Sequence, residues 1–388
     1  MIPVYEPDLG LMEERYLLEA YRSGWISSKG EFLSRFEEGF ARWVKVRHAL
    51  AASSGTTALH LALSALAAGP GDEVIVPALT YVATANAVAY SGARPIFADS
   101  SAASWTLDPK DVEQRITERT RGIIAVHLYG RPAEMDRILS IAEEHGLWVI
   151  EDAAEAPGAR VFGQPVGSVG TIGCFSFFGN KILTTGEGGM VTTNDEHLAQ
   201  LMFRYRGQGV SPTVTYWHDL VGYNYRLTNL AAAIGLAQLE RIDEILRKKE
   251  QLALWYRQRL SEVEGIQLPQ PLEWAEEVCW MYSVLVPRRD EVRAQLAEAG
   301  IETRPFFFPV YKMPIYYEPT LHLPVAESLS QAGINLPSST RLTEAEVDYI
   351  CSTLAQILRK TKPLRLTKAA RPARQVRTEI GPTLERTS

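Results

Sequence analysis

Lys181 lies in the stretch FSFFGNKILTTGEGGM (residues 175–190), where aromatic residues, glycines and hydroxyl-bearing side chains are its neighbours. Withdrawing an amine from water lowers its pKa, and the neutral amine is a nucleophile that attacks carbonyl carbons. A solvated surface lysine is the ordinary alternative, but aromatic neighbours do not favour it. We therefore expect Lys181 to do chemistry, and ask which other groups share its site.

Polar residues follow three of the short apolar runs in the first half of the chain. The segment SSGTT (residues 53–57) follows RHALAA, Thr80–Tyr81 follows VIVPAL, and Glu151–Asp152 with Glu155 follows LWVI. A turn of small residues that leads into a helix exposes N–H groups and the positive end of the helix dipole to a phosphate, although the same residues could form a plain N-cap. Polar strand ends that converge indicate a shared ligand site.

Strand and helix patterns alternate around these groups. Continuous apolar runs of strand length occupy residues 72–78, 93–99, 122–130 and 147–152, and helical spacing occupies residues 107–117 and 134–146. This order predicts an α/β fold whose mostly parallel sheet is covered by helices on both faces. Ligands bind such sheets at the carboxyl ends of the strands.

The second half predicts a smaller unit. A helical pattern over residues 229–260 would lead into an α+β unit with a strand at 279–287 and helices at 290–300 and 342–360. We predict a large α/β domain (residues 1–240), a small C-terminal α+β domain (residues 241–361) and a basic tail (residues 362–388). From Arg359 onward, nine Lys and Arg stand against two Glu, with three prolines. This composition favours a disordered tail over an arm that binds a polyanion.

The whole-chain composition excludes several classes of protein. The net charge of -6 gives no reason to expect nucleic acid as a partner. Three cysteines without a CxxC pair indicate a reducing compartment, and the seven histidines show no metal-ligand spacing. The acidic start of the chain is unlike a signal peptide, and Pro77, Asn86 and Ser91 interrupt the uncharged stretch at residues 74–93. We expect a cytoplasmic protein without a membrane span.

Seven segments together resemble the DegT/DnrJ/EryC1/StrS family of sugar-nucleotide aminotransferases, which use pyridoxal phosphate. They are SSGTTALHLAL, EVIVPALTYVATANAV, HLYG, EDAAEAPGA, FSFFGNKILTTGEGGMVTTND, YWHDLVGYNYRLTNLAAAIGLAQLE and RPFFFPVY. The similarity runs in order from about residue 2 to residue 358. GWISSKG, FSFFGNK and YWHDLVGYNYRLTN are similar in particular to the branch that makes GDP-perosamine.

The resemblance implies a fold of the type I, aspartate aminotransferase-like class and a site for pyridoxal 5'-phosphate (PLP). Lys181 would bind the cofactor's aldehyde covalently and then shuttle protons, and Asp152 would pair with the pyridine nitrogen. Glu155 would face the ring hydroxyl or the sugar, and Tyr81 would stack on the ring. The groups that hold the phosphate would be Gly55, Thr56 and Ser176.

Four further residues follow from the same resemblance. Asn224 would reach the phosphate of the neighbouring subunit's cofactor, so that the site would be complete only in a homodimer; a turn asparagine is the alternative. His127, Arg304 and Tyr311 would lie on the substrate side, although a structural histidine bonded to backbone is an equal alternative for His127. The family commonly has histidine where this chain has Tyr311, which bears on the sugar accepted.

The implied reaction moves the amino group of L-glutamate to C4 of GDP-4-keto-6-deoxymannose. The product, GDP-perosamine, would serve surface polysaccharide such as the O-antigen of lipopolysaccharide. A UDP- or dTDP-linked 3-keto or 4-keto sugar is the alternative substrate, and a PLP-binding regulator without turnover is the alternative class. Dehydratases of the family carry histidine in place of the lysine, so Lys181 argues against them. No GxGxxG follows an early strand, which disfavours a Rossmann dehydrogenase.

Overall fold

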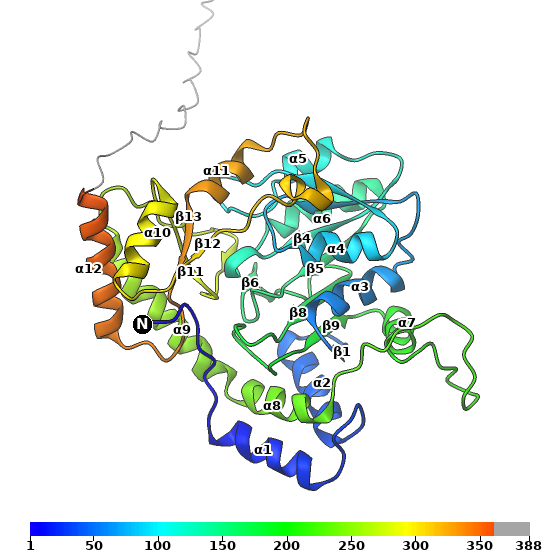
Figure 1. Cartoon of the computed structure of the whole chain (residues 1–388). Helices are drawn as coiled ribbons and strands as arrows, with labels where there is room; N and C mark the ends of the chain where they lie inside the picture. The colour runs from blue at the N-terminus through cyan, green and yellow to red at the C-terminus, as the bar shows by residue number, and fades with distance from the viewer. Residues whose placement is uncertain (361–388) are drawn as a thin grey trace, which may run out of the picture.

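A seven-stranded sheet forms the centre of the computed structural model, which describes residues 1–360 (Figure 1). Its strand order is β1-β9-β8-β5-β4-β2-β3. The pairs from β8 to β3 are parallel, whereas β9 runs antiparallel to both of its neighbours. The strands are β1 (His48–Ala52), β2 (Glu73–Pro77), β3 (Arg94–Ala98), β4 (Thr120–Val126), β5 (Trp148–Asp152), β8 (Ile172–Ser176) and β9 (Gly189–Thr193).

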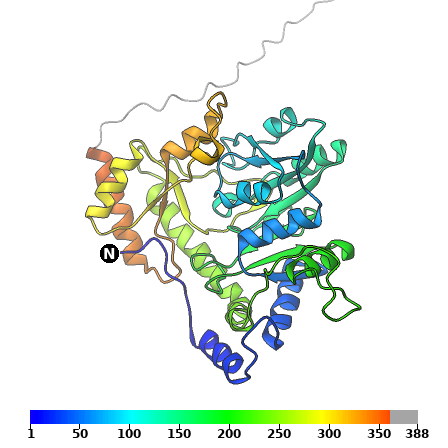
Figure 2. The ribbon, with the colours of Figure 1, turned by 45° about the vertical axis from the view of Figure 1, so that its right-hand side comes forward.

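The predicted mostly parallel α/β sheet is confirmed, and β2, β3 and β5 lie within their predicted strand runs. Strand β4 overlaps the run predicted at residues 122–130 but begins two residues earlier, and the end of that run forms a 3-10 turn at Leu128–Gly130. Central strands such as β2 and β8 are buried along their whole length, which explains their continuous apolar sequences. Helices flank the sheet, as the two views in Figures 1 and 2 show. They include α2 (Glu31–Val44), α3 (Gly55–Ala65), α4 (Ala83–Tyr90), α5 (Pro109–Gln114), α6 (Met135–His145) and α7 (Glu196–Arg206).

A second hydrophobic cluster lies beside the sheet, at the left of Figure 1. It surrounds the antiparallel strands β11 (Tyr282–Leu285), β12 (Arg304–Pro305) and β13 (Gly333–Leu336), which pair in the order β11-β13-β12. Its helices are α9 (Ile242–Leu260), α10 (Arg289–Glu298) and α12 (Glu344–Lys360). Helix α9 contributes Ile242 and Ile245 to the large core but Leu252, Tyr256 and Leu260 to this second one. The domain boundaries stay a prediction, and the basic tail falls outside the described residues.

Further regular elements are three shorter strands and helix α11 (Pro324–Ala332), which precedes β13. A small sheet pairs β10 (Ala275–Glu276), β6 (Arg160–Val161) and β7 (Gln164–Pro165). Short 3-10 turns occupy Leu128–Gly130, Val310–Lys312 and Pro314–Tyr316.

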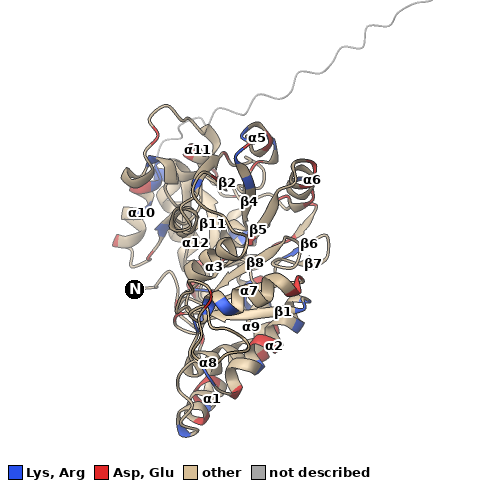
Figure 3. Cartoon of the chain, turned by 90° about the vertical axis from the view of Figure 1, so that its right-hand side faces the viewer, with Lys and Arg blue, Asp and Glu red and all other residues tan. Residues whose placement is uncertain are grey.

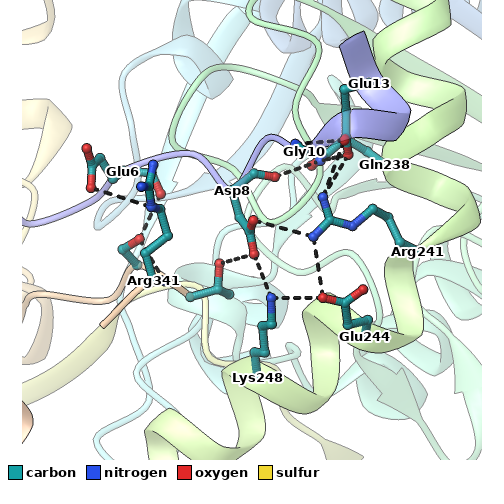
Figure 4. Close-up of polar contacts among 11 residues, drawn as sticks. Glu6, Asp8, Gly10, Glu13, Gln238, Arg241, Glu244, Lys248 and Arg341 are labelled. Atoms are coloured by element: carbon teal, nitrogen blue, oxygen red, sulfur yellow. Dashed lines mark hydrogen bonds and ion pairs between the residues drawn. The ribbon is translucent and has the colours of Figure 1, made fainter. Parts of the chain in front are cut away.

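The helical pattern predicted for residues 229–260 is divided at Arg241 into α8 (Asn229–Glu240) and α9. The guanidinium of Arg241 lies between the carboxylates of Glu13, Asp8 and Glu244, as Figure 4 shows. Asp8 also pairs with Lys248 at 3.0 Å. These ion pairs tie the N-terminal segment to the turn between the two helices, a long-range arrangement that helical periodicity alone does not reveal.

The N-terminal segment continues into α1 (Leu11–Arg22), which packs with α2 against α8. Acidic and basic residues alternate along α1 and α2 on their exposed sides (Figure 3). The apolar face of α2 is buried through Phe32, Phe36 and Phe40. The pattern is that of amphipathic helices covering an apolar surface.

An arm of residues 207–224 extends from α7 at the right of Figure 1. Two isolated bridges, Gly207 with Asn224 and Val210 with His218, hold its two sides together. Tyr216 and Val221 on this arm are 91% and 88% exposed. Within residues 1–360, no helix is long and apolar enough to span a membrane, and no group of His, Cys, Asp and Glu is placed to bind a metal ion.

Candidate active site

A cavity of about 390 Å³ opens at the carboxyl ends of the central strands, as the sequence predicts for this class of sheet. Most of the predicted site residues line it. They are Gly55, Thr56, Tyr81, Asp152, Glu155, Ser176, Lys181 and Arg304. The structure therefore brings together residues that are spread over 250 positions of the chain.

Lys181 lies on the turn between β8 and β9, and its backbone is held on both sides. Its amide donates to the carbonyl of Phe178 at 2.9 Å, and its carbonyl accepts from the hydroxyl of Tyr5 at 2.8 Å. Thr184 donates to the carbonyl of Phe177 at 3.0 Å and closes the turn. The antiparallel return of β9 thus presents the lysine at a rigid position.

The amino group of Lys181 is nearly out of water, with its side chain 11% exposed, and lies 3.6 Å from Oε1 of Glu155. Burial lowers the pKa of Lys181, although Glu155 and Asp152 oppose this shift. Burial also raises the pKa of Glu155, to about 7. Both groups are therefore closer to neutrality than in water, which suits proton transfer.

Asp152 ends β5, and its carboxylate points into the cavity. The hydroxyl of Thr84 donates to its Oδ2 at 2.8 Å, and the amide of Ala154 donates to Oδ1 at 3.3 Å. Burial raises the pKa of Asp152, because these two donors and the charge of Lys181 compensate for only part of the lost hydration. A further cationic partner at this carboxylate would therefore offset the remaining cost of its burial.

The first turn of α3 faces the same cavity. Ser54 caps the helix and accepts from the amide of Thr57 at 3.1 Å, whereas the amides of Gly55 and Thr56 have no acceptor within the helix. A Cβ on Gly55 would lie 2.7 Å from Cβ of Ser176, so only glycine permits this approach. Two free amides, a hydroxyl and a helix N-terminus make a site for a phosphate.

Tyr81 is 58% exposed although it lies beside the buried strand β2. Its ring contacts Phe307, with 5.7 Å between centroids. An exposed aromatic face at a cavity wall is available for stacking against a flat ligand.

Three predicted residues do not reach the cavity. His127 is fully buried: its Nε2 lies 3.0 Å from Glu151 and its Nδ1 accepts from the amide of Ala133, which corresponds to the structural alternative. Tyr311 is 1% exposed and donates its hydroxyl to Glu327, so it packs in the core and not at the substrate side. Asn224 is exposed on the arm and accepts from Arg226 at 3.0 Å.

Several lining residues were missed by the sequence analysis, above all Trp280, Asn335 and Phe307. Trp280 precedes β11, and its ring lies under the amine of Lys181. A tryptophan at the edge of a predicted strand has the pattern of a core residue, so no local signal distinguishes it. Thr84 has only a weak local indication in the sequence: it lies three residues after Tyr81, in the segment that follows β2.

Comparison with known proteins agrees with this geometry. The model of the DegT/DnrJ/EryC1/StrS aminotransferase family matches residues 7–355. The chain belongs to this family. Similar proteins include GDP-perosamine synthase of Caulobacter vibrioides, 49% identical over 92% of this chain and 98% of that protein. The GDP-perosamine synthase of Escherichia coli O157:H7 is 47% identical, over 91% and 97%.

A solved structure of Spr1654 from Streptococcus pneumoniae in its PLP form resembles this member of the aminotransferase family throughout. The TM-score is 0.88 at 29% identity, with 92% of this chain and 99% of that chain covered. The fold is that of the type I PLP-dependent aminotransferases, as predicted.

The residues of this aminotransferase also fit PLP chemically. The cavity offers a buried amine for an aldehyde, a carboxylate with few donors for a ring nitrogen, and an exposed aromatic face for the ring; these groups belong to Lys181, Asp152 and Tyr81. Gly55 and Thr56, whose amides at the start of α3 are free, line the same cavity and suit the phosphate.

Proposed function

We propose that this protein transfers the amino group of L-glutamate to C4 of GDP-4-keto-6-deoxymannose and so makes GDP-perosamine. The observation that carries the reaction class is the buried amine of Lys181 at 3.6 Å from Glu155 in the cavity that also contains Asp152. The choice of sugar and base is supported by the two GDP-perosamine synthases, which match almost the whole chain.

Six residues would hold the cofactor. Lys181 would attach it, Asp152 would pair with the ring nitrogen, and Tyr81 would cover the ring. The phosphate would be bound by Gly55, Thr56 and Ser176. When bound, PLP supplies a carbonyl that carries the amino group and a ring that withdraws electrons from the adjoining carbon.

Proton movement would centre on Nζ of Lys181. With its pKa lowered by burial, the free amine can take the α-proton of the donor amino acid and give it up again on the cofactor side before the keto acid leaves. In the sugar half-reaction the same nitrogen would move a proton in the opposite sense, to C4 of the sugar. Glu155 faces the same nitrogen and stabilises the ammonium between these steps.

Recognition of the donor would involve Arg304. Lys181 and Arg304 are the cationic side chains that line the cavity in the described part of the chain. The side chain of Arg304 is 52% exposed, and its ion pair with Glu302 is long, at 4.0 Å. A guanidinium with free donors binds a carboxylate in a bidentate manner, as glutamate requires.

A second subunit would complete the site. We infer that Asn224 reaches the phosphate bound by the partner, because it lies exposed at the base of the arm and away from the cavity of its own chain. The exposed Tyr216 and Val221 would be covered by that contact. Light scattering of the purified protein checks the dimer, and an Asn224→Ala variant should bind PLP more weakly.

The experiment that tests the function begins with the visible absorbance of the purified protein before and after addition of L-glutamate. A band that appears with PLP and disappears with glutamate supports the cofactor and the donor. Addition of GDP-4-keto-6-deoxymannose should then restore the band and yield GDP-perosamine by mass spectrometry. Restoration by a UDP- or dTDP-linked keto sugar instead would contradict the GDP assignment, and no response to glutamate would favour a regulator without turnover.

A further inference from the structure

Trp280 lies directly against the amine of Lys181. Nζ of the lysine is 3.7 Å from the centroid of the indole ring, which is 5% exposed. At this distance the negative face of the ring attracts an ammonium group, and the attraction grows when water is excluded. The contact connects the turn between β8 and β9, which carries Lys181, to the segment that precedes β11.

The backbone and ring of Trp280 are fixed by three contacts. Its indole N–H donates at 2.7 Å to the carbonyl of Asn180, the residue before the lysine. Its carbonyl accepts at 2.8 Å from Nζ of Lys249, a fully buried lysine on α9. The ring stacks on Tyr129 with an interplanar angle of 18° and 6.1 Å between centroids. A side chain held in this way presents one face at a defined place.

The segment that carries Trp280 also packs closely against Gly130, in the 3-10 turn that follows β4 of the large sheet. The amide of Val278 donates to the carbonyl of Gly130 at 3.1 Å. Gly130 has φ +90°, and a Cβ there would lie 1.8 Å from the carbonyl oxygen of Val278. No other residue could allow this approach without a backbone shift.

Two carboxylates and one aromatic ring act on the amine. Glu155 lies 3.6 Å away, the charge of Asp152 also acts on it, and the ring of Trp280 contacts it. The carboxylates attract the ammonium through charge and, at Glu155, through a hydrogen bond. The ring face gives it an attractive position that needs no hydrogen bond and leaves its protons free.

We propose that Trp280 is a positioning residue, whose ring face holds the amino group of Lys181 in place whenever that amine is not covalently engaged. Its importance for turnover rests on the proposed function, whereas its hold on the amine does not. An aliphatic side chain of similar size would keep the site dry but would not attract the ammonium.

The test measures the amine itself in the full-length, cofactor-free protein. Cyanate modifies neutral amines, so the modification rate of the Lys181 peptide against pH, followed by mass spectrometry, reports the pKa of this lysine. Trp280→Leu and Trp280→Met should lower that pKa by about 0.5 to 1.5 units, and Trp280→Phe should keep most of the wild-type value. Two aliphatic variants are used because methionine fills irregular spaces if leucine prevents folding.

Trp274→Leu is the matched control, since Trp274 lies on the same connecting segment but does not line the cavity. It should leave the pKa of Lys181 unchanged. An unchanged or raised pKa in both aliphatic Trp280 variants would overturn the proposal.

In the PLP-loaded enzyme, Trp280→Leu should lower kcat about tenfold with a smaller change in KM, and Trp280→Phe should restore most of it. If the wild-type protein aminates no sugar, the proposed function fails while the cyanate experiment still decides the role of Trp280.

Discussion

Two buried glutamates, Glu151 and Glu155, lie close together in the chain but differ in how fully their oxygens are hydrogen-bonded. Glu151 accepts from three amides of the 167–170 turn, at 2.6 to 2.9 Å, and lies 3.0 Å from His127. Glu155 accepts one amide hydrogen bond, from Tyr129 at 2.8 Å. Both are at least 95% buried, so burial does not distinguish them.

The electrostatic outcome is opposite for the two carboxylates. Burial acts to raise both pKa values, but the hydrogen bonds from His127 and from the backbone outweigh it at Glu151, whose pKa is lowered. At Glu155 burial prevails over the charge of Lys181, and the pKa rises to about 7. The fully hydrogen-bonded carboxylate therefore stabilises the strand end, and the incompletely hydrogen-bonded one is available for chemistry.

The largest effect is expected from Lys181→Ala, which removes the amine that pairs with the incompletely hydrogen-bonded Glu155. Turnover should fall by about 10³-fold or more, because the variant loses both the cofactor attachment and the proton carrier. The fold should be retained, since the backbone hydrogen bonds that hold the turn, from the amide of residue 181 to Phe178 and from Tyr5 to its carbonyl, do not depend on the side chain. Steady-state kinetics and circular dichroism check the two parts.

Lys110→Ala serves as the control for that variant, because Lys110 is an exposed lysine on α5. It should leave kinetics and spectrum unchanged. Normal turnover by a purified Lys181→Ala protein, free of wild-type enzyme, would remove Lys181 from the mechanism.

Asp152→Asn is expected to lower kcat about 100-fold, since an amide cannot stabilise a positive charge on a ring nitrogen. Stability should change less, because the amide oxygen can still accept from Thr84. Kinetics with saturating PLP, compared with the Lys181→Ala loss, measures how much of the chemistry depends on the carboxylate. A kcat equal to wild type would show that Asp152 does not act on the cofactor.

Glu151→Gln should show the reverse behaviour, with a loss of stability of about 3 kcal/mol and a kcat close to wild type for the folded protein. One of its oxygens becomes an NH₂ group that faces the amide donors or His127 in a buried place. Denaturant unfolding of the cofactor-free protein measures the loss. A stable but inactive variant would mean that the Glu151 cluster acts in catalysis and that the contrast between the two glutamates is false.

The smallest effect concerns pH. Because the folded-state pKa of Glu155 is about 7 and the unfolded value is near 4.5, its contribution to stability is fully present below pH 4.5 and is lost as pH rises to about 7. The glutamine of Glu155→Gln does not titrate, so the variant does not lose this contribution as pH rises. Its free energy of unfolding, taken relative to that of the wild type, should therefore increase by about 1 to 3 kcal/mol between pH 5 and pH 8. Unfolding of the cofactor-free proteins at several pH values measures this difference, and a difference that does not change with pH would refute the raised pKa.

Much of the site was predictable because its residues follow strand ends. Asp152, Tyr81 and the Gly55–Thr56 turn lie directly after buried apolar runs, and a parallel sheet brings all its carboxyl ends to one edge. The turn that presents Lys181 is also local, with glycines and hydroxyls within a few residues.

The directions of the His127 and Tyr311 side chains could not be predicted in the same way. Each is adjacent to a predicted site segment, but the direction of a side chain depends on which face of its element meets the core. His127 is oriented toward Glu151 and the amide of Ala133, and Tyr311 toward Glu327. Adjacency in sequence could not distinguish these inward directions from a cavity-facing one.

Residue types within short segments were enough to predict the mostly parallel sheet and the edge at which its ligands should bind, and the family resemblance added Lys181 and Asp152 as predicted site residues. Only the folded chain reveals that Trp280 contacts the amine of Lys181 and that Glu155, not Glu151, is left incompletely bonded. Such features arise from contacts between segments far apart in the chain. Their formation depends on how the two hydrophobic clusters pack, which local propensity does not encode.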